Sequence, residues 1–194
     1  RHAQGAHFTS QADIAKVVGP TIVAPWRSRL DEATTIAELQ QLLLDLATFR
    51  VLDPACGSGN FLYVAYREMR RLEHETIALI ADRRRSENLA AQGTISHVSP
   101  DRFLGIDINP FAIEVARVTL LLAKKLAADE FDLAEDVLPF DNLDKTIVCA
   151  DALFTPWPAA HAIIGNPPYL GRRKMVRELG GAYTNRLAEA HPDV

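Results

Sequence analysis

A short apolar run, broken at once by a glycine-rich loop and then by a helical pattern, most constrains how this chain can fold. Residues 49–53 have β-type character, and a proline and two glycines interrupt them between positions 54 and 59. Apolar residues then recur at helical spacing and continue through a charged stretch toward Asn88. This order predicts a strand, a tight loop and an unusually long helix.

A second strand-to-helix unit follows. Residues 103–107 form another β-type run, Asn109 is placed to cap a helix, and Pro110 suits the first helical position. The helix should extend at least to Leu122. Two more short β-type runs lie at 147–149 and 162–164. Alternating strands and helices predict an α/β fold with a parallel sheet and helical crossovers, in which ligands bind outside the carboxyl ends of the strands.

The region before the first strand has a helical pattern. Ser10 and Thr35 each start a capping-box-like spacing ahead of apolar residues that recur at helical intervals, and the second helix should end near Thr48. We therefore expect an N-terminal helical segment over residues 1–48 and an α/β domain over residues 49–194.

Composition narrows the function. The chain has 194 residues, 48% of them hydrophobic, and a formal net charge of -4, so it does not hold a polyanion over its whole surface and any nucleic-acid contact must be local. No apolar run approaches the roughly 20 residues that span a bilayer, and the first residues lack the charged-then-apolar pattern of a signal peptide, so we expect a cytoplasmic protein with no membrane contact.

Several reactive or charged side chains are expected to have ordinary roles. Cys56 and Cys149 show neither CxxC nor Cys/His spacing, which predicts buried free thiols, no metal site and no disulfide. The six histidines show no partner pattern, so we expect surface or capping roles for them. The arginine run 83–85 is expected to lie on a solvated helix face.

The loop from Asp53 to Gly59 is a candidate cofactor site. Gly57 and Gly59 would let a ligand approach the backbone beside a helix N-terminus. Leu62 stands where a dinucleotide-binding loop needs its third glycine, which argues against a nicotinamide or flavin enzyme. A plain glycine-rich turn is the alternative.

Two aspartates follow later strands. Asp107 offers two acceptor oxygens to the hydroxyls of a ribose, and Asp151 could accept a hydrogen bond from an exocyclic amine. In a dinucleotide-binding fold the acidic residue that binds the ribose follows the glycine loop by roughly 20 residues, whereas Asp107 lies much further from Gly59. The long helix would therefore be an insertion between the first and second strands. Helix capping by Asp107 and a simple turn at Asp151 are the competing interpretations.

The sharpest motif is Asn166-Pro167-Pro168-Tyr169, directly after the last β-type run. Two prolines with fixed φ and no N–H hold the backbone rigid. The Asn166 side-chain oxygen and the Pro167 carbonyl could accept from one NH2 group, while Tyr169 offers a ring for stacking on a base. The alternative is a proline-rich loop without chemistry.

Taken together, DPACGSGNF, GIDINP, ADAL and GNPPY resemble the ordered motifs of Rossmann-like, S-adenosylmethionine-dependent DNA adenine-N6 methyltransferases. GAHFTS, at residues 5–10, resembles the N-terminal motif of the subgroup in which that motif comes first. DPACGSGNFLYVAYREMRRLE and GNPPYLGRRKM are particularly similar to the large restriction-modification polypeptides of the MmeI type. The resemblance covers residues 5 to about 175 and implies the sheet of a class I methyltransferase, here incomplete.

The resemblance also implies residue roles. The methionine part of the cofactor would be held by Phe8, Thr9 and the loop that contains Asp53, Ala55, Gly57 and Gly59. Asp107 would bind the ribose, Ile108 one adenine face and Asp151 the adenine amine. Asn166, Pro167 and Tyr169 would face a target adenine flipped out of double-stranded DNA.

The family continues after Asn-Pro-Pro-Tyr with further strands and a target-recognition domain, so we expect the 194 residues alone to bind the cofactor weakly or not at all and to be inactive. Whether a fused nuclease shares the polypeptide stays open. Arg172, Arg173, Lys174 and Arg177 could contact phosphates or be merely solvated. Two rival functions stay open. One is methylation of a protein glutamine by the same acceptor geometry, and the other is a catalytically silent docking or DNA-binding module.

Overall fold

The computed structural model describes residues 9–90, 98–132 and 143–192, and its first part is helical. The elements there are α1 (Gln11–Val18), a π-helical turn η1 (Gly19–Val23), α2 (Ala24–Glu32) and α3 (Ile36–Thr48). Both predicted helix starts are confirmed, because Ser10 and Thr35 accept hydrogen bonds from the third residue of their helices. Thr35 and Glu38 complete a capping box. The continuation of α1 through η1 into α2 was not predicted.

Four parallel strands form the sheet: β1 (Val51–Asp53), β2 (Phe103–Asp107), β3 (Ile147–Cys149) and β4 (Ala162–Ile163). Their order is β3-β2-β1-β4, with β1 paired to both β2 and β4. The predicted parallel sheet is confirmed. Strand β1 is shorter than the predicted run because Phe49 caps the C-terminus of α3.

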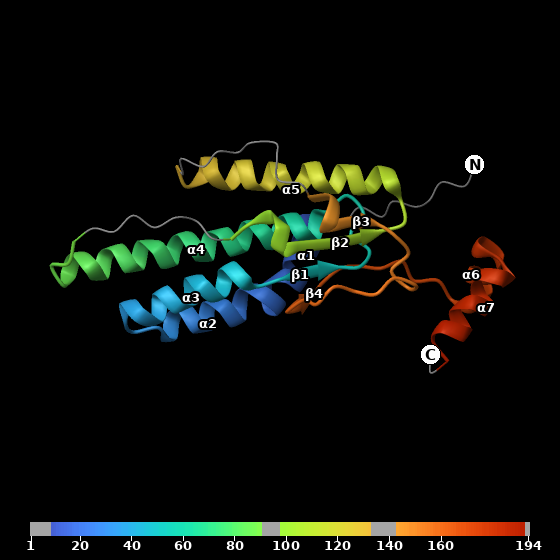
Figure 1. The fold of residues 1–194 in the computed structure, drawn as a ribbon, viewed down its shortest axis with the longest axis horizontal. Helices are drawn as coiled ribbons and strands as arrows, with labels where there is room; N and C mark the ends of the chain where they lie inside the picture. Colours follow the sequence, from blue (N-terminus) through green and yellow to red (C-terminus); the bar gives the residue numbers. More distant parts are fainter. Residues whose placement is uncertain (1–8, 91–97, 133–142, 193–194) are drawn as a thin grey trace.

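Two long helices connect the strands. Helix α4 (Asn60–Ser86) links β1 to β2, and α5 (Pro110–Glu130) follows β2, with Asn109 accepting from the backbone of Phe111 as predicted. At about 1.5 Å per residue α4 is about 40 Å long, and Figure 1 shows it extending with α3 well past the sheet. Helix α5 continues beyond Leu122 to Glu130.

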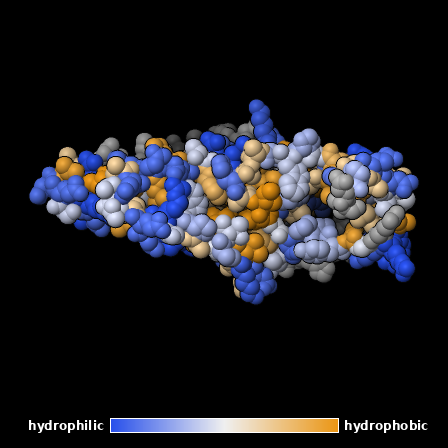
Figure 2. Space-filling view, turned by 90° about the horizontal axis from the view of Figure 1, so that it is seen from below, coloured by the Kyte–Doolittle hydropathy of each residue, from blue (hydrophilic) through white to orange (hydrophobic). Residues whose placement is uncertain are grey.

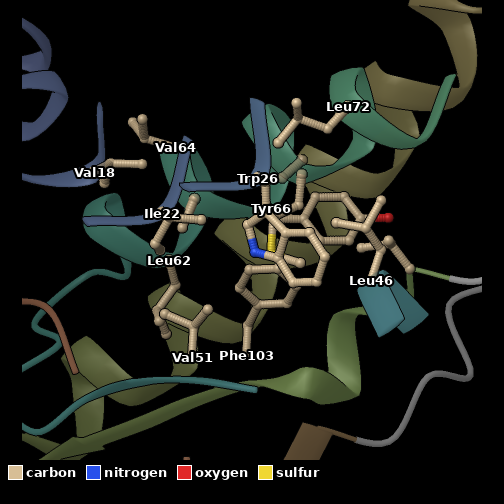
Figure 3. Packing of buried hydrophobic residues seen from close by; sticks show 14 of the residues in the cluster. Val18, Ile22, Trp26, Leu46, Val51, Leu62, Val64, Tyr66, Leu72 and Phe103 are labelled. Atoms are coloured by element: carbon tan, nitrogen blue, oxygen red, sulfur yellow. The ribbon is translucent and has the colours of Figure 1, made fainter. Parts of the chain in front are cut away.

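The main core lies between the sheet and this helical layer. Val51 and Phe103 point from the strands toward Leu62 and Tyr66 of α4 (Figure 3), and the Phe103 and Tyr66 rings meet edge to face with centroids 5.2 Å apart. The other face of the sheet carries a smaller cluster: Leu52, Leu104 and Ile106. The chain after β3 covers it with small side chains, namely Ala150, Ala152 and Ala160.

The last two helices, α6 (Arg172–Leu179) and α7 (Gly181–Ala190), were not predicted. Figure 1 shows them apart from the helical layer, at the end of the molecule toward which the strands run. Among the described helices, none is long and apolar enough to cross a membrane. Seen from below, the surface is mostly hydrophilic, with apolar residues gathered toward the middle (Figure 2).

Two predictions about individual side chains are wrong in part. Cys56 is buried as expected, but Cys149 is exposed because it ends a strand at the edge of the sheet. Arg83 does not lie on a fully solvated helix face, because its guanidinium donates to the Ala33 carbonyl at 2.8 Å and is half-buried there. Arg85 of the same run is exposed.

Candidate cofactor and base-binding site

The loop after β1 depends on two glycines with positive φ. Gly59, at φ 83°, caps α4, and a Cβ there would lie 3.1 Å from Ala116 of α5. Position 59 therefore favours glycine for two reasons, its positive φ and its close packing against Ala116. Gly57, at φ 50°, has open space where a Cβ would stand. The backbone there is accessible to a ligand.

Asp107 ties this loop to the end of β2. Its Oδ2 accepts from the Gly57 amide at 2.9 Å, and its Oδ1 accepts from the Asn109 amide at 2.8 Å. The capping interpretation of Asp107 is wrong, because Asn109 caps α5 and the bond from the Asn109 amide to Asp107 forms an aspartate turn just before that cap. A carboxylate offers about four lone-pair sites, so two remain for hydroxyl groups of a ligand. The neighbouring Ile108 side chain is 61% exposed.

Asp53 lies beneath the loop, with no exposed surface. Its Oδ1 accepts from the Ala55 amide at 3.0 Å, while Oδ2 has no hydrogen-bond partner among the described residues. Burial raises the pKa of Asp53 to about 7, and the nearby Asp107 charge adds to the rise, against the Ala55 hydrogen bond. Any influence of Asp53 on a ligand therefore passes through the loop that it supports.

The Asp53 carboxyl group also packs on the chain that enters the Asn-Pro-Pro-Tyr motif. Gly165 follows β4 at φ 146°, and a Cβ there would lie 2.5 Å from Asp53 Oδ1. Sequence reasoning missed this contact, although a glycine directly before the motif is a signal for a close approach. Asn166 and Pro167 are exposed, and the Tyr169 side chain is 84% exposed.

Asp151 follows β3 and is half-buried. Its Oδ1 accepts from the Leu153 amide at 3.0 Å, as in an aspartate turn. Its Oδ2 accepts from the hydroxyl of Tyr183 on α7 at 2.9 Å, a contact that the sequence did not predict. The exposed Ile108 lies close by along the sheet edge, since Cys149 Sγ is 3.6 Å from the Ile108 carbonyl oxygen.

The structure thus brings most of the predicted site residues to the carboxyl ends of the strands. Hydrogen bonds join Asp53 to Ala55 and Gly57 to Asp107, and the Gly59 amide closes the same loop by donating to the Cys56 carbonyl. Thr9 stands half-buried just before α1, and among the described residues no hydrogen bond joins it to the others. Phe8 lies outside the described residues.

A parallel sheet with a glycine loop after β1, acidic residues at the end of β2 and after β3, and Asn-Pro-Pro-Tyr after β4 is the arrangement of the Rossmann-like class I methyltransferase fold. The particular family follows from a match of residues 30–187 to the family model described as "MmeI, DNA-methyltransferase domain". The chain belongs to this family.

Individual relatives agree. The chain is 34% identical over 188 residues to DNA methyltransferase A of Bacillus subtilis, which covers 90% of this chain and 21% of that protein. It is 35% identical over 186 residues to the adenine-specific methyltransferase PglX of Streptomyces coelicolor, covering 74% of this chain and 14% of PglX. The chain therefore spans about a fifth, or less, of these relatives.

A solved structure is also similar. The Type IIL restriction-modification enzyme MmeI, determined in complex with DNA, superposes with a TM-score of 0.73 at 29% identity. The match covers 91% of this chain and 26% of MmeI. This chain therefore has the fold of the matching part of MmeI.

Proposed function

We propose that this chain is the cofactor-binding and catalytic part of a DNA methyltransferase that transfers a methyl group from S-adenosylmethionine to N6 of adenine in a restriction-modification or related defence system. The observation that carries the proposal is the packing of Asp53 against Gly165. This contact places the glycine loop directly beside the start of the Asn-Pro-Pro-Tyr motif. Cofactor and base would therefore meet at one edge of the sheet.

The residues fit S-adenosylmethionine. The open backbone at Gly57 admits a ligand, and the Asp107 carboxylate has acceptor capacity for ribose hydroxyls. Ile108 is exposed for packing on adenine, and Asp151 can accept from the adenine amine. When bound, the cofactor supplies an electrophilic methyl group on a positively charged sulfur. Thr9, with Phe8 before it, would complete the site at the methionine end.

Asn166, Pro167 and Tyr169 would position the target base. The Asn166 side-chain oxygen and the Pro167 carbonyl would accept the two N6 hydrogens and orient the nitrogen lone pair toward the methyl group. The new N–C bond would then form as the methyl–sulfur bond breaks and S-adenosylhomocysteine is released. Tyr169, highly exposed here, stacks on the flipped adenine. The nitrogen then loses one proton to water. No side chain need act as a strong base in advance, because the nitrogen becomes acidic only as it gains the methyl group.

Double-stranded DNA is the proposed partner. Arg173 and Arg177 of α6 are exposed a few residues after Tyr169, where phosphates beside a flipped base would lie. The proposed phosphate contacts are confined to this helix, as expected for a chain whose net charge is -4. We further propose that sequence selection, and any nuclease, come from other parts of the complete polypeptide.

Methyl transfer can be tested with tritiated S-adenosylmethionine and the complete natural protein, offered DNA and a glutamine-containing translation release factor in parallel. We expect label on DNA, reduced about 100-fold or more in Asn166→Ala, by analogy with the loss of other preorganised polar groups. Asn185→Ala, an exposed asparagine on α7, is the matched control and should keep wild-type transfer. Label on the protein alone would refute the proposal and favour a glutamine methyltransferase.

A further inference from the structure

Helix α7 is attached to the turn after β3 by three contacts that involve neither oxygen of Asp151. The Tyr183 ring meets the Phe154 ring edge to face, with centroids 5.4 Å apart. The Arg186 guanidinium lies 3.8 Å above the same Phe154 ring. His191 Nε2 is 2.7 Å from the Leu153 carbonyl oxygen. These contacts fix α7 beside Asp151, although α7 has no fully buried residue.

The fourth contact reaches Asp151 itself. The Tyr183 hydroxyl donates to Oδ2 at 2.9 Å, while the Leu153 amide donates to Oδ1 at 3.0 Å. Each carboxylate oxygen thus has one neutral donor, one from its own turn and one from a helix later in the chain. Burial and the hydrogen bond to Asp151 raise the pKa of Tyr183 to about 12, so its hydroxyl remains a donor at neutral pH.

We infer that Tyr183 is a positioning residue for cofactor recognition, holding the Asp151 carboxylate in the orientation that accepts the exocyclic amine of the cofactor's adenine. The inference rests on the proposed function. Each oxygen keeps a lone pair for a ligand, and Asp151 is only half-buried, so the amine can reach it. A carboxylate held on both oxygens loses less rotational freedom on binding.

This role predicts selectivity at one position of the purine ring. Adenine presents a donor NH2 at C6, whereas hypoxanthine presents an acceptor oxygen that an ionised carboxylate repels. Asp151, fixed by Tyr183, should therefore distinguish S-adenosylhomocysteine from S-inosylhomocysteine, which differ in the group at C6 and in the N1 hydrogen that accompanies the oxygen. Without the hydroxyl, the carboxylate can rotate away and the distinction weakens.

The test uses Tyr183→Phe, which removes the hydroxyl and keeps the ring on Phe154. Calorimetric titration of the complete natural protein with the two ligands should show a preference for S-adenosylhomocysteine in the wild type. In Tyr183→Phe we expect that preference to fall about 10-fold, the lower end of the effect of one hydrogen bond to a charged group. The affinity for S-inosylhomocysteine should not change.

Two further variants separate the hydroxyl from the docking of α7. His191→Ala removes the contact with Leu153 and leaves Asp151 untouched, so it should keep the wild-type preference. In an Asp151→Asn background, Tyr183→Phe should have little additional effect, because both changes act on one interaction.

Several results would overturn the inference. Equal loss of affinity for both ligands would make Tyr183 a structural residue, and tighter binding of S-adenosylhomocysteine by Tyr183→Phe would show that the hydroxyl competes with adenine. If the wild type prefers S-adenosylhomocysteine and Tyr183→Phe keeps the same preference, the inference is overturned while the proposed function stands. A wild type that binds neither ligand overturns the proposed function and the inference together.

Discussion

Asp53 makes the stability of this fold depend on pH in a direction opposite to that of most carboxylates. The side chain has no exposed surface, and only one of its oxygens has a hydrogen-bond partner among the described residues. Burial raises its pKa to about 7, from 3.8 for an ordinary aspartate. Replacing Asp53 with Asn keeps the acceptor for the Ala55 amide and removes the ionisable group.

The sign follows from proton binding. Between pH 4 and pH 7 the unfolded chain has lost the Asp53 proton while the folded chain still holds it, so stability falls as pH rises. Each unit of pKa difference is worth about 1.4 kcal/mol, so the raised pKa corresponds to at most about 4 kcal/mol. The loss should be complete above about pH 7 and absent below about pH 4.

Urea unfolding from pH 4 to pH 8, followed by fluorescence of the buried Trp26 in a Trp157→Phe background, measures this effect. The free energy of unfolding of wild type minus that of Asp53→Asn should decline by up to about 1.4 kcal/mol per pH unit between pH 4 and pH 7, then level off. Taking the difference cancels the titration of other groups. A flat difference, or one that rises with pH, would refute the proposed burial of Asp53.

Two further changes test the geometry of the site. Gly165→Ala should destabilise the fold in thermal unfolding by about 1–3 kcal/mol through its backbone conformation alone. It should also weaken S-adenosylmethionine binding in calorimetry, because a Cβ would collide with Asp53. Gly171→Ala, where a Cβ meets open space, is the control, and equal effects of the two substitutions would contradict the contact between Gly165 and Asp53. Replacing Arg173 and Arg177 together with Gln should weaken DNA binding and lower the slope of log K against log salt by about 1–2 in a fluorescence-anisotropy titration. An unchanged slope would mean that these arginines do not meet phosphates.

Much of the fold was predictable because its signals are local. The caps at Ser10 and Thr35, the proline after Asn109 and the two loop glycines each specify a boundary within a few residues. Alternation of strands with helices then implied a parallel sheet. Helices α6 and α7 were missed because each begins at a glycine that makes no side-chain cap, and because neither buries an apolar residue among those described.

The candidate site was predictable as a set of residues and less so as an arrangement. Sequence reasoning placed acidic side chains at the strand ends, and the topology brings those ends together. The contacts of Asp53 with Gly165 and of Asp151 with Tyr183 join residues far apart in the chain, and no local pattern indicates them. Burial of Asp53, and with it the raised pKa, likewise depends on packing.

The most direct test of adenine-N6 methylation is nucleoside analysis of DNA after incubation with S-adenosylmethionine and the complete natural protein. Digestion and mass spectrometry distinguish N6-methyldeoxyadenosine from N4- and C5-methyldeoxycytidine. We expect N6-methyldeoxyadenosine with the wild type and almost none with Asn166→Ala. Methylated cytosine, or equal adenine methylation by both proteins, would contradict the role of Asn166-Pro167-Pro168-Tyr169 as the site that holds the target adenine.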